Sequence, residues 1–281
     1  MQGFFLSKKF PLCKCDIMLR IKSTRIRMDW LEKKGIDPQR ITTGLALLAG
    51  IIVIGLIDNF FLMWLVLGGL YLVAFYEANK LFNIDNNSLY AYAAILWIVA
   101  GFYPYPDDLF FIAAVIFASV LAYTQELKFK YFYPFIYPTA GFLFLLTMYS
   151  EYGIVSLAWL LVVVAGADIG AYFVGKSMGK TKFCETSPNK TLEGVIGGVL
   201  VATGLGFMVG VTFVDIDKAI VISLLAGIAS IFGDLFESYL KRKAGVKDSG
   251  DILPGHGGIL DRVDGYLFAS IIMLVLLRGL V

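Results

Sequence analysis

Acidic and basic side chains are concentrated in residues 238–266, SYLKRKAGVKDSGDILPGHGGILDRVDGY, which lie between two strongly apolar stretches. Asp261 and Asp264 are three residues apart where the last apolar stretch begins, so on a helix their carboxylates point the same way. On the preceding apolar stretch, polar residues recur every three or four positions and so share one helix face: Ser230, Asp234, Glu237, Ser238 and Lys241. Asp234 can therefore converge with Asp261 and Asp264. Mg²⁺ prefers oxygen ligands, commonly one or two carboxylates together with substrate phosphates. We therefore predict that Asp234, Asp261 and Asp264 are catalytic residues that hold the metal, with Asp234 binding it directly or through a water molecule.

Basic residues and a glycine turn surround these carboxylates. Lys241 is predicted to be catalytic, and the turn GlyHisGlyGly at 255–258 lets backbone approach a ligand closely. Carboxylates for a metal and cations for phosphate oxygens are what phosphoryl or nucleotidyl transfer needs. A ring of interfacial salt bridges is the alternative, although it does not explain why the carboxylates lie deeper than the Lys and Arg. The residues predicted to bind substrate are Lys190, Arg242, Lys247, Arg262, Ser187, Asp168, Gly257 and Gly258.

A second polar region runs from residue 167 to 198. Asp168 lies within an apolar stretch, where an ionised carboxylate is costly, so it is expected to face a polar cavity or a cation. A neutral, hydrogen-bonded packing residue is the alternative. Ser187 or Asn189 is expected to cap the next helix while Lys190 reaches a phosphate, with capping alone as the alternative.

Residues 170–177, GAYFVGKS, match the phosphate-loop pattern GxxxxGK[ST]. That motif needs a strand before it and a helix after it, whereas here it lies at the end of an expected membrane helix. We interpret the match as accidental. The spaced glycines Gly166, Gly170, Gly194 and Gly198 are expected to let helices approach closely.

Composition predicts an all-α, polytopic integral membrane protein, because hydrophobic residues make up 58% of the 281 residues and charged residues 16%. A spanning helix needs roughly 20 mainly apolar residues, which gives about nine transmembrane helices. The third and fourth stretches are short, so eight is the alternative. The stretches are 41–57, 60–77, 88–103, 109–124, 131–149, 153–175, 191–213, 217–240 and 259–280.

Basic residues predict the orientation. With nine spans and a cytoplasmic N-terminus, all of the 24 Lys and Arg except Lys218 and Arg278 fall on the cytoplasmic side, which follows the positive-inside rule. We expect residues 1–40 to be a basic cytoplasmic segment. Residues 41–281 are expected to be a transmembrane catalytic domain in the cell inner membrane, with an active site within about 166–266 that faces the cytoplasm.

The first 40 residues do not resemble a secretory signal, because no long apolar core precedes a small-residue cleavage site. A basic segment lying on anionic lipid is expected, with a frayed extension and a start at Met28 as the alternative. Cys13, Cys15 and Cys184 form no disulfide framework. Reduced thiols in the cytosol are the simpler interpretation.

The motifs carry a family resemblance. Ser238 to Asp264 resembles the pattern of the phosphatidate cytidylyltransferase (CDP-diacylglycerol synthase) family, in which S-x-apolar-KR is followed by KD, P-x-HGG and DR-apolar-D. The D-x-x-AY helix and SP-x-KT-x-EG segment of that family resemble Asp168 to Tyr172 and Ser187 to Gly194. The two blocks cover about a fifth of the chain. The first 27 residues are not part of the pattern.

The resemblance implies a Mg²⁺-dependent reaction in which CTP and phosphatidate give CDP-diacylglycerol and pyrophosphate. The number of carboxylates leaves room for a second cation. Phosphatidate is already anionic, so catalysis can consist of positioning and charge neutralisation. His256 is expected to brace the glycine turn or contact phosphate, with a role as an acid as the alternative. No nucleic-acid partner is expected, and a homodimer is an open alternative to a monomer.

Two other functions are weighed against this one. A CTP-using enzyme that acts on an ether-lipid phosphate or a polyprenol would also need a bound cation and basic residues for the triphosphate. A transporter would also place carboxylates within the membrane, but repeated halves with matching interruptions are typical of transporters. The sequence contains no convincing internal repeat.

Overall fold

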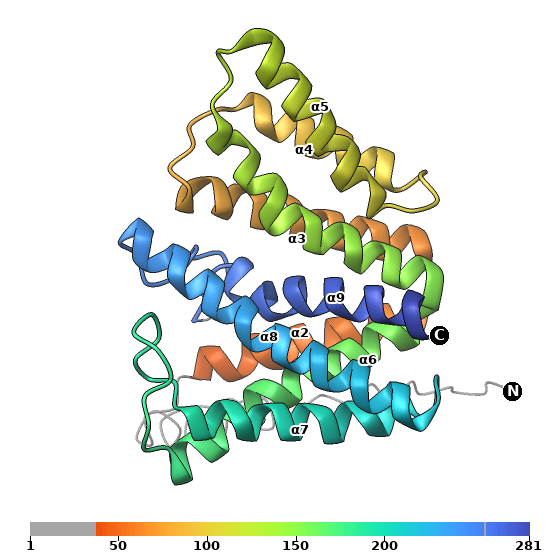
Figure 1. Ribbon diagram of the computed structural model, residues 1–281, viewed down its shortest axis with the longest axis vertical. Coiled ribbons are helices and arrows are strands. Elements are labelled where there is room, and N and C mark those ends of the chain that lie inside the picture. The colour runs from red at the N-terminus through yellow and green to blue at the C-terminus, as the bar shows by residue number, and fades with distance from the viewer. Residues whose placement is uncertain (1–37, 256) are drawn as a thin grey trace, which may run out of the picture.

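The computed structural model describes residues 38–255 and 257–281, and this part of the chain folds into helices without a β-strand. Most of the predicted basic segment 1–40 lies outside it. Two short helical turns, η1 (Phe129–Phe132) and η2 (Phe135–Thr139), lead into α6. The longer helices (Figure 1) are α2 (Pro38–Ile57), α3 (Phe60–Leu81), α4 (Ser88–Ala100), α5 (Asp108–Thr124), α6 (Ala140–Met178), α7 (Leu192–Gly210), α8 (Ile216–Ala244) and α9 (Leu260–Leu280).

Helix α6 consists of two parts joined at Gly153, where φ is 69° and ψ is −171°. Glycine adopts this left-handed conformation without the steric penalty that a Cβ would impose. The two parts run in different directions in Figure 1. They correspond to the expected helices at 131–149 and 153–175.

Length and composition allow five helical segments of the described chain to cross a membrane. These are Phe60–Leu81, Phe129–Met178, Leu192–Gly210, Ile216–Ala244 and Leu260–Leu280. The other apolar helices, Thr42–Ile57, Ser88–Ala100 and Asp108–Thr124, are shorter. The all-α, apolar character of the fold is therefore confirmed, whereas the count of about nine spans stays a prediction.

Helices α6, α7, α8 and α9 pack together as the bundle that carries the candidate site. Small residues allow α6 and α7 to approach closely: a Cβ at Gly198 would lie 2.7 Å from the Ala167 carbonyl oxygen, and one at Gly170 would lie 2.7 Å from Val201 Cβ. Contacts of this kind let membrane helices pack through their backbones. The packing role expected for these spaced glycines is confirmed.

The ends of the bundle differ in their polar contacts. At one end, Arg278 of α9 forms ion pairs with Asp107 and with Glu151 of α6, both at 2.5 Å. At the other end, α3, α6 and α8 finish where α7 and α9 begin, on the left of Figure 1. The candidate site lies at this second end.

Candidate active site

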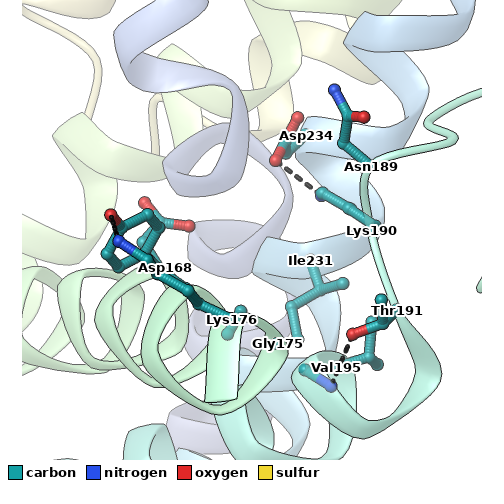
Figure 2. A pocket seen from close by; sticks show the side chains of 12 residues that line it. Asp168, Gly175, Lys176, Asn189, Lys190, Thr191, Val195, Ile231 and Asp234 are labelled. Atoms are coloured by element: carbon teal, nitrogen blue, oxygen red, sulfur yellow. Dashed lines mark hydrogen bonds and ion pairs between the residues drawn. The ribbon is translucent and has the colours of Figure 1, made fainter. Parts of the chain in front are cut away.

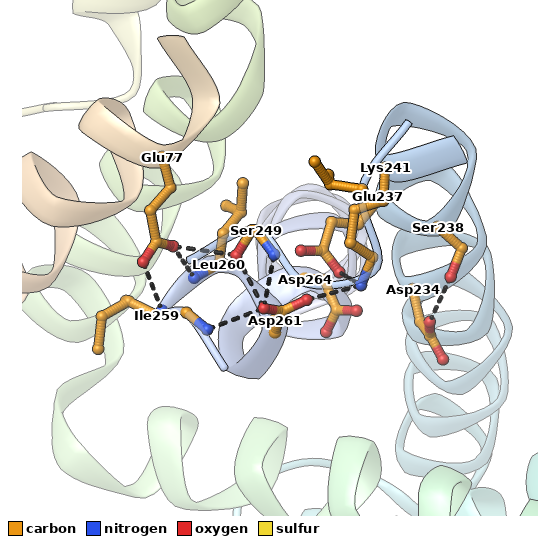
Figure 3. A network of polar contacts seen from close by, with 12 residues as sticks. Glu77, Asp234, Glu237, Ser238, Lys241, Ser249, Ile259, Leu260, Asp261 and Asp264 are labelled. Carbon is orange, nitrogen blue, oxygen red and sulfur yellow. Dashed lines mark hydrogen bonds and ion pairs between the residues drawn. The ribbon is translucent and has the colours of Figure 1, made fainter. Parts of the chain in front are cut away.

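A lysine bridge joins α8 to α9. Lys241 Nζ lies 2.8 Å from Glu237 Oε2, one turn earlier on α8, and 2.7 Å from Asp261 Oδ1 in the first turn of α9 (Figure 3). The Glu237 side chain is 0% exposed and that of Asp261 is 6% exposed. The spacing that placed the polar residues of α8 on one face therefore delivers Glu237 and Lys241 to the first turn of α9.

Asp261 is the centre of a hydrogen-bond network. Its Oδ2 accepts hydrogen bonds from the Ser249 amide at 2.9 Å, the Ser249 hydroxyl at 2.9 Å and the Gly258 amide at 2.8 Å. With Lys241 on Oδ1, both oxygens are engaged. A cation that binds Asp261 directly would compete with the Lys241 ammonium group at Oδ1.

Glu77, on α3, was not predicted to belong to the site. Its buried carboxylate accepts hydrogen bonds from the amides of Ile259 at 3.0 Å and Leu260 at 2.8 Å, where α9 begins. In the sequence Glu77 is a single acidic residue at the end of the expected apolar stretch 60–77, a position typical of an interfacial residue. No local pattern connects it to a helix that starts more than 180 residues later.

A cavity of about 520 Å³ lies between α6, α7 and α8 (Figure 2). Lys190 Nζ is 2.6 Å from Asp234 Oδ2 in this cavity, and Ser238 donates a 3.3 Å hydrogen bond to the other Asp234 oxygen. Asp168 and Lys176 also line it, with apolar residues forming much of the wall. The cavity therefore brings Asp168, Lys190 and Asp234 together.

The loop before α7 is held by residues other than the predicted caps. Thr191, and not Ser187 or Asn189, caps α7, with its hydroxyl accepting a 3.2 Å hydrogen bond from the Gly194 amide. Thr191 directly precedes the helix, whereas the Ser187 carbonyl oxygen accepts from the Lys190 amide in a turn before it. Asn189 lines the cavity instead.

The segment that matches a phosphate loop, 170–177, lies wholly within α6. Its amides are therefore engaged in a helix rather than arranged as a loop after a strand. The interpretation of the match as accidental is confirmed.

A second, more polar cavity of about 510 Å³ lies beside the loop between α8 and α9. Lys247, Arg262 and Gly257 line it, together with Asp248 and Asp251. The structure thus brings together three of the residues predicted to bind substrate.

Two other residues predicted to bind substrate are placed differently. Arg242 is exposed and donates a 3.4 Å hydrogen bond to the Val246 carbonyl oxygen. Gly258 is buried, and its amide donates to Asp261. His256 lies outside the described residues.

Magnesium was predicted to bind Asp234, Asp261 and Asp264. Within residues 38–255 and 257–281, no three His, Cys, Asp or Glu side chains form a group that could hold a metal. However, Asp168 and Asp234 line the same cavity, and Glu237 Oε1 is buried without a hydrogen-bond partner. Because Mg²⁺ often takes only one or two carboxylates plus substrate phosphates, these oxygen donors fit the ion, and the ligand set stays a prediction.

Comparison with known proteins identifies the family. The sequence profile of the cytidylyltransferase family matches residues 38–280. The chain belongs to the cytidylyltransferase family. Two proteins from strains of Helicobacter pylori, both named phosphatidate cytidylyltransferase, are similar to this cytidylyltransferase over most of its length. One is 47% identical over 247 residues, which cover 86% of this chain and 92% of the relative. The other is 45% identical over 238 residues, which cover 84% and 90%.

A relative with the same name from Thermotoga maritima is 38% identical over 192 residues, which cover 63% of this cytidylyltransferase and 71% of the relative. The family match includes α2 to α9 and therefore both cavities and the Lys241 bridge. The family resemblance carried by the sequence motifs is confirmed.

Proposed function

We propose that this cytidylyltransferase transfers the cytidylyl group of CTP to phosphatidate and releases pyrophosphate, giving CDP-diacylglycerol for phospholipid biosynthesis. The observation that carries the proposal is the 47% identity, over 92% of its length, to a protein named phosphatidate cytidylyltransferase. The carboxylates and lysines where α8 meets α9 provide the charges that such a transfer requires.

In this proposal each cavity binds one of the two substrates. The cavity between α6, α7 and α8 suits the lipid, because apolar residues such as Ile231 and Val195 line it beside Lys176 and Lys190. An acyl chain can lie along the apolar wall while the lipid phosphate meets Lys190. The polar cavity suits CTP, with Lys247 and Arg262 for the triphosphate.

The reaction needs no nucleophile from the protein. An oxygen of the lipid phosphate attacks the α-phosphorus of CTP and pyrophosphate leaves, while Lys247 and Arg262 neutralise the charge on the departing oxygens. Cys184, the free cysteine of the described residues, is partly exposed, and it does not line either cavity. Bound Mg²⁺, held by Asp264 with Asp234 and Asp261, would neutralise phosphate charge.

Lys241 has a second role in this proposal. Its ammonium group keeps Glu237 and Asp261 compensated while no substrate is present. Lys241 could move from Asp261 Oδ1 towards a phosphate oxygen of bound CTP. This exchange of partners fits its expected catalytic role.

The proposal includes about nine spans, an inner-membrane location and an active site that faces the cytoplasm. It is supported by the basic residues of the 179–191 loop and of the end of α8, which lie at the same end of the bundle as the site. Cytoplasmic ends of membrane helices are typically rich in Lys and Arg. The mass of the purified protein in detergent decides between a monomer and a homodimer.

An acceptor comparison tests the proposed substrate. Purified protein in detergent is given CTP, MgCl₂ and one lipid at a time: phosphatidate, an archaeal-type ether-lipid phosphate or a polyprenol. We expect pyrophosphate release and a cytidylylated lipid, detected by mass spectrometry, with phosphatidate as the best acceptor. Faster turnover of either other lipid, or a phosphorylated polyprenol as the product, would contradict the proposal.

A further inference from the structure

Glu77 links α3 to the start of α9 across the interior of the protein (Figure 3). The residue is 1% exposed, and its carboxylate accepts from the Ile259 amide at 3.0 Å and the Leu260 amide at 2.8 Å. The Ser249 hydroxyl lies 3.1 Å from Glu77 Oε2. One side chain therefore contacts both α9 and the loop that precedes it.

The helix start explains how a buried carboxylate is tolerated here. Within the described part of the chain, no basic side chain forms an ion pair with Glu77. The first amides of a helix have no partners within the helix, and the helix dipole favours negative charge there. Glu77 uses this preference. The amides of Ile259 and Leu260, which would otherwise suit a substrate phosphate, are already occupied.

Two glycines make room for the Glu77 carboxylate. A Cβ at Gly250 would collide with Glu77 Oε1, and a Cβ at Gly258 would lie 2.6 Å from both Glu77 carboxylate oxygens. Real Cβ contacts are essentially never this short. Both glycines therefore allow Glu77 to approach the loop. For Gly258, the sequence alone favoured the approach of a ligand.

The Ser249 hydroxyl connects Glu77 to the candidate active site. It lies 3.1 Å from Glu77 and 2.9 Å from Asp261 Oδ2, and its single proton can serve either carboxylate. Glu77 thus fixes the backbone from which Asp261 and Asp264 project and also touches a donor to Asp261.

We propose that Glu77 is a positioning residue that sets the first turn of α9, and with it Asp261 and Asp264, for the transfer reaction. The role in catalysis rests on the proposed function, whereas the role in holding α9 does not. Glu77 contacts no substrate in this proposal, because it is buried behind the loop that lines the polar cavity.

Glu77→Gln tests the proposal, because an amide keeps the size of the side chain but replaces one acceptor with a donor that faces backbone amides. A misplacement of about 1 Å at a reacting group can cost about 100-fold in rate. We expect kcat to fall about 10- to 100-fold while KM for CTP and for the lipid changes less than about threefold. Glu126→Gln, an exposed carboxylate between α5 and η1, is the matched control and should leave both constants unchanged.

Hydrogen exchange gives a measurement that does not depend on activity. Amides in residues 249–262 should exchange faster in Glu77→Gln than in the wild type, whereas amides of α7 should not change. Unchanged exchange in 249–262 would overturn the proposal, and so would a lower melting temperature with an unchanged kcat. If wild-type protein fails to join CTP to phosphatidate but exchange still rises, the proposed function fails and the role of Glu77 in holding α9 stands.

A double-mutant cycle tests the contact itself. Gly250→Ala should lower kcat at least about tenfold in the wild type, because the new Cβ meets Glu77. In a Glu77→Ala background the same change should lower kcat less than about twofold further. Gly69→Ala, on α3 with nothing within 4 Å of the new Cβ, is the control. An equal loss from Gly250→Ala in both backgrounds would contradict the contact.

Discussion

Lys241→Met removes the ammonium group that lies between two buried carboxylates but keeps most of the apolar stem. Glu237 Oε2 and Asp261 Oδ1 are 2.8 and 2.7 Å from this group, and the Lys241 side chain is only 12% exposed. Loss of the group leaves Glu237 without a compensating charge and leaves Asp261 with its three neutral donors. The variant therefore changes the charge balance with little change in shape.

The cost can be worked from these contacts. Removing one partner of a buried ion pair destabilises a protein by about 3–5 kcal/mol, because the remaining charge is buried and unpaired. Glu237 is 0% exposed and its other oxygen already lacks a partner, so Lys241→Met belongs in this range. At about 1.4 kcal/mol for each factor of ten, the ratio of folded to unfolded protein falls by roughly two to three and a half orders of magnitude.

Denaturant unfolding in detergent micelles measures the effect. Lys243→Met is the matched control, because Lys243 lies on the same turn of α8 but is exposed. It should change the free energy of unfolding by less than about 0.5 kcal/mol. Adding Glu237→Gln to Lys241→Met should recover part of the loss, because it removes the uncompensated charge. A Lys241→Met variant as stable as Lys243→Met would refute the reasoning.

Three further outcomes are expected. Asp261→Asn and Asp264→Asn should each lower kcat by orders of magnitude at saturating Mg²⁺, because an essential cation organises both reacting groups. Asp251→Asn, in the exposed loop, should lower kcat less. Near-normal turnover of Asp261→Asn and Asp264→Asn would refute their assignment as metal ligands. A cysteine placed beside Lys247 should be labelled only from the cytoplasmic face and one beside Asp107 only from the opposite face, and labelling of both from one side would contradict nine spans. Label should not pass from pyrophosphate into CTP without lipid, because no protein nucleophile is used; exchange by rigorously lipid-free protein would require a covalent intermediate.

The sequence predicted the positions of the helices more accurately than it predicted the residues at which they end. Apolar runs predicted the positions of the helices, and the separate stretches 131–149 and 153–175 correspond to the two parts of α6 on either side of Gly153. Helix α8 reaches Ala244, past the predicted end at 240. Lys241, Arg242 and Lys243 continue it because basic residues are favourable in the last turn of a helix, and Gly245, with a φ of 72°, ends it.

The site was predictable where its contacts are local and not where they are between helices. The three- and four-residue spacing on α8 predicted that Glu237 and Lys241 share a face, and the structure confirms this. The sequence could not tell that Lys241 would pair with Asp261 or Lys190 with Asp234, because such pairs depend on how whole helices pack. Glu77 was missed for the same reason. The role of Gly258 was misread because the carboxylate that lies where its Cβ would be belongs to Glu77, on α3.

One labelling measurement tests the central claim most directly. Purified protein with MgCl₂ and phosphatidate is incubated in parallel with CTP carrying ³²P at the α-phosphate and with CTP carrying ³²P at the γ-phosphate, and the lipid is extracted from each. Cytidylyl transfer predicts label in the lipid only from the α-phosphate, with the γ-label recovered in pyrophosphate. Label in the lipid from the γ-phosphate, or from neither position, would contradict the account.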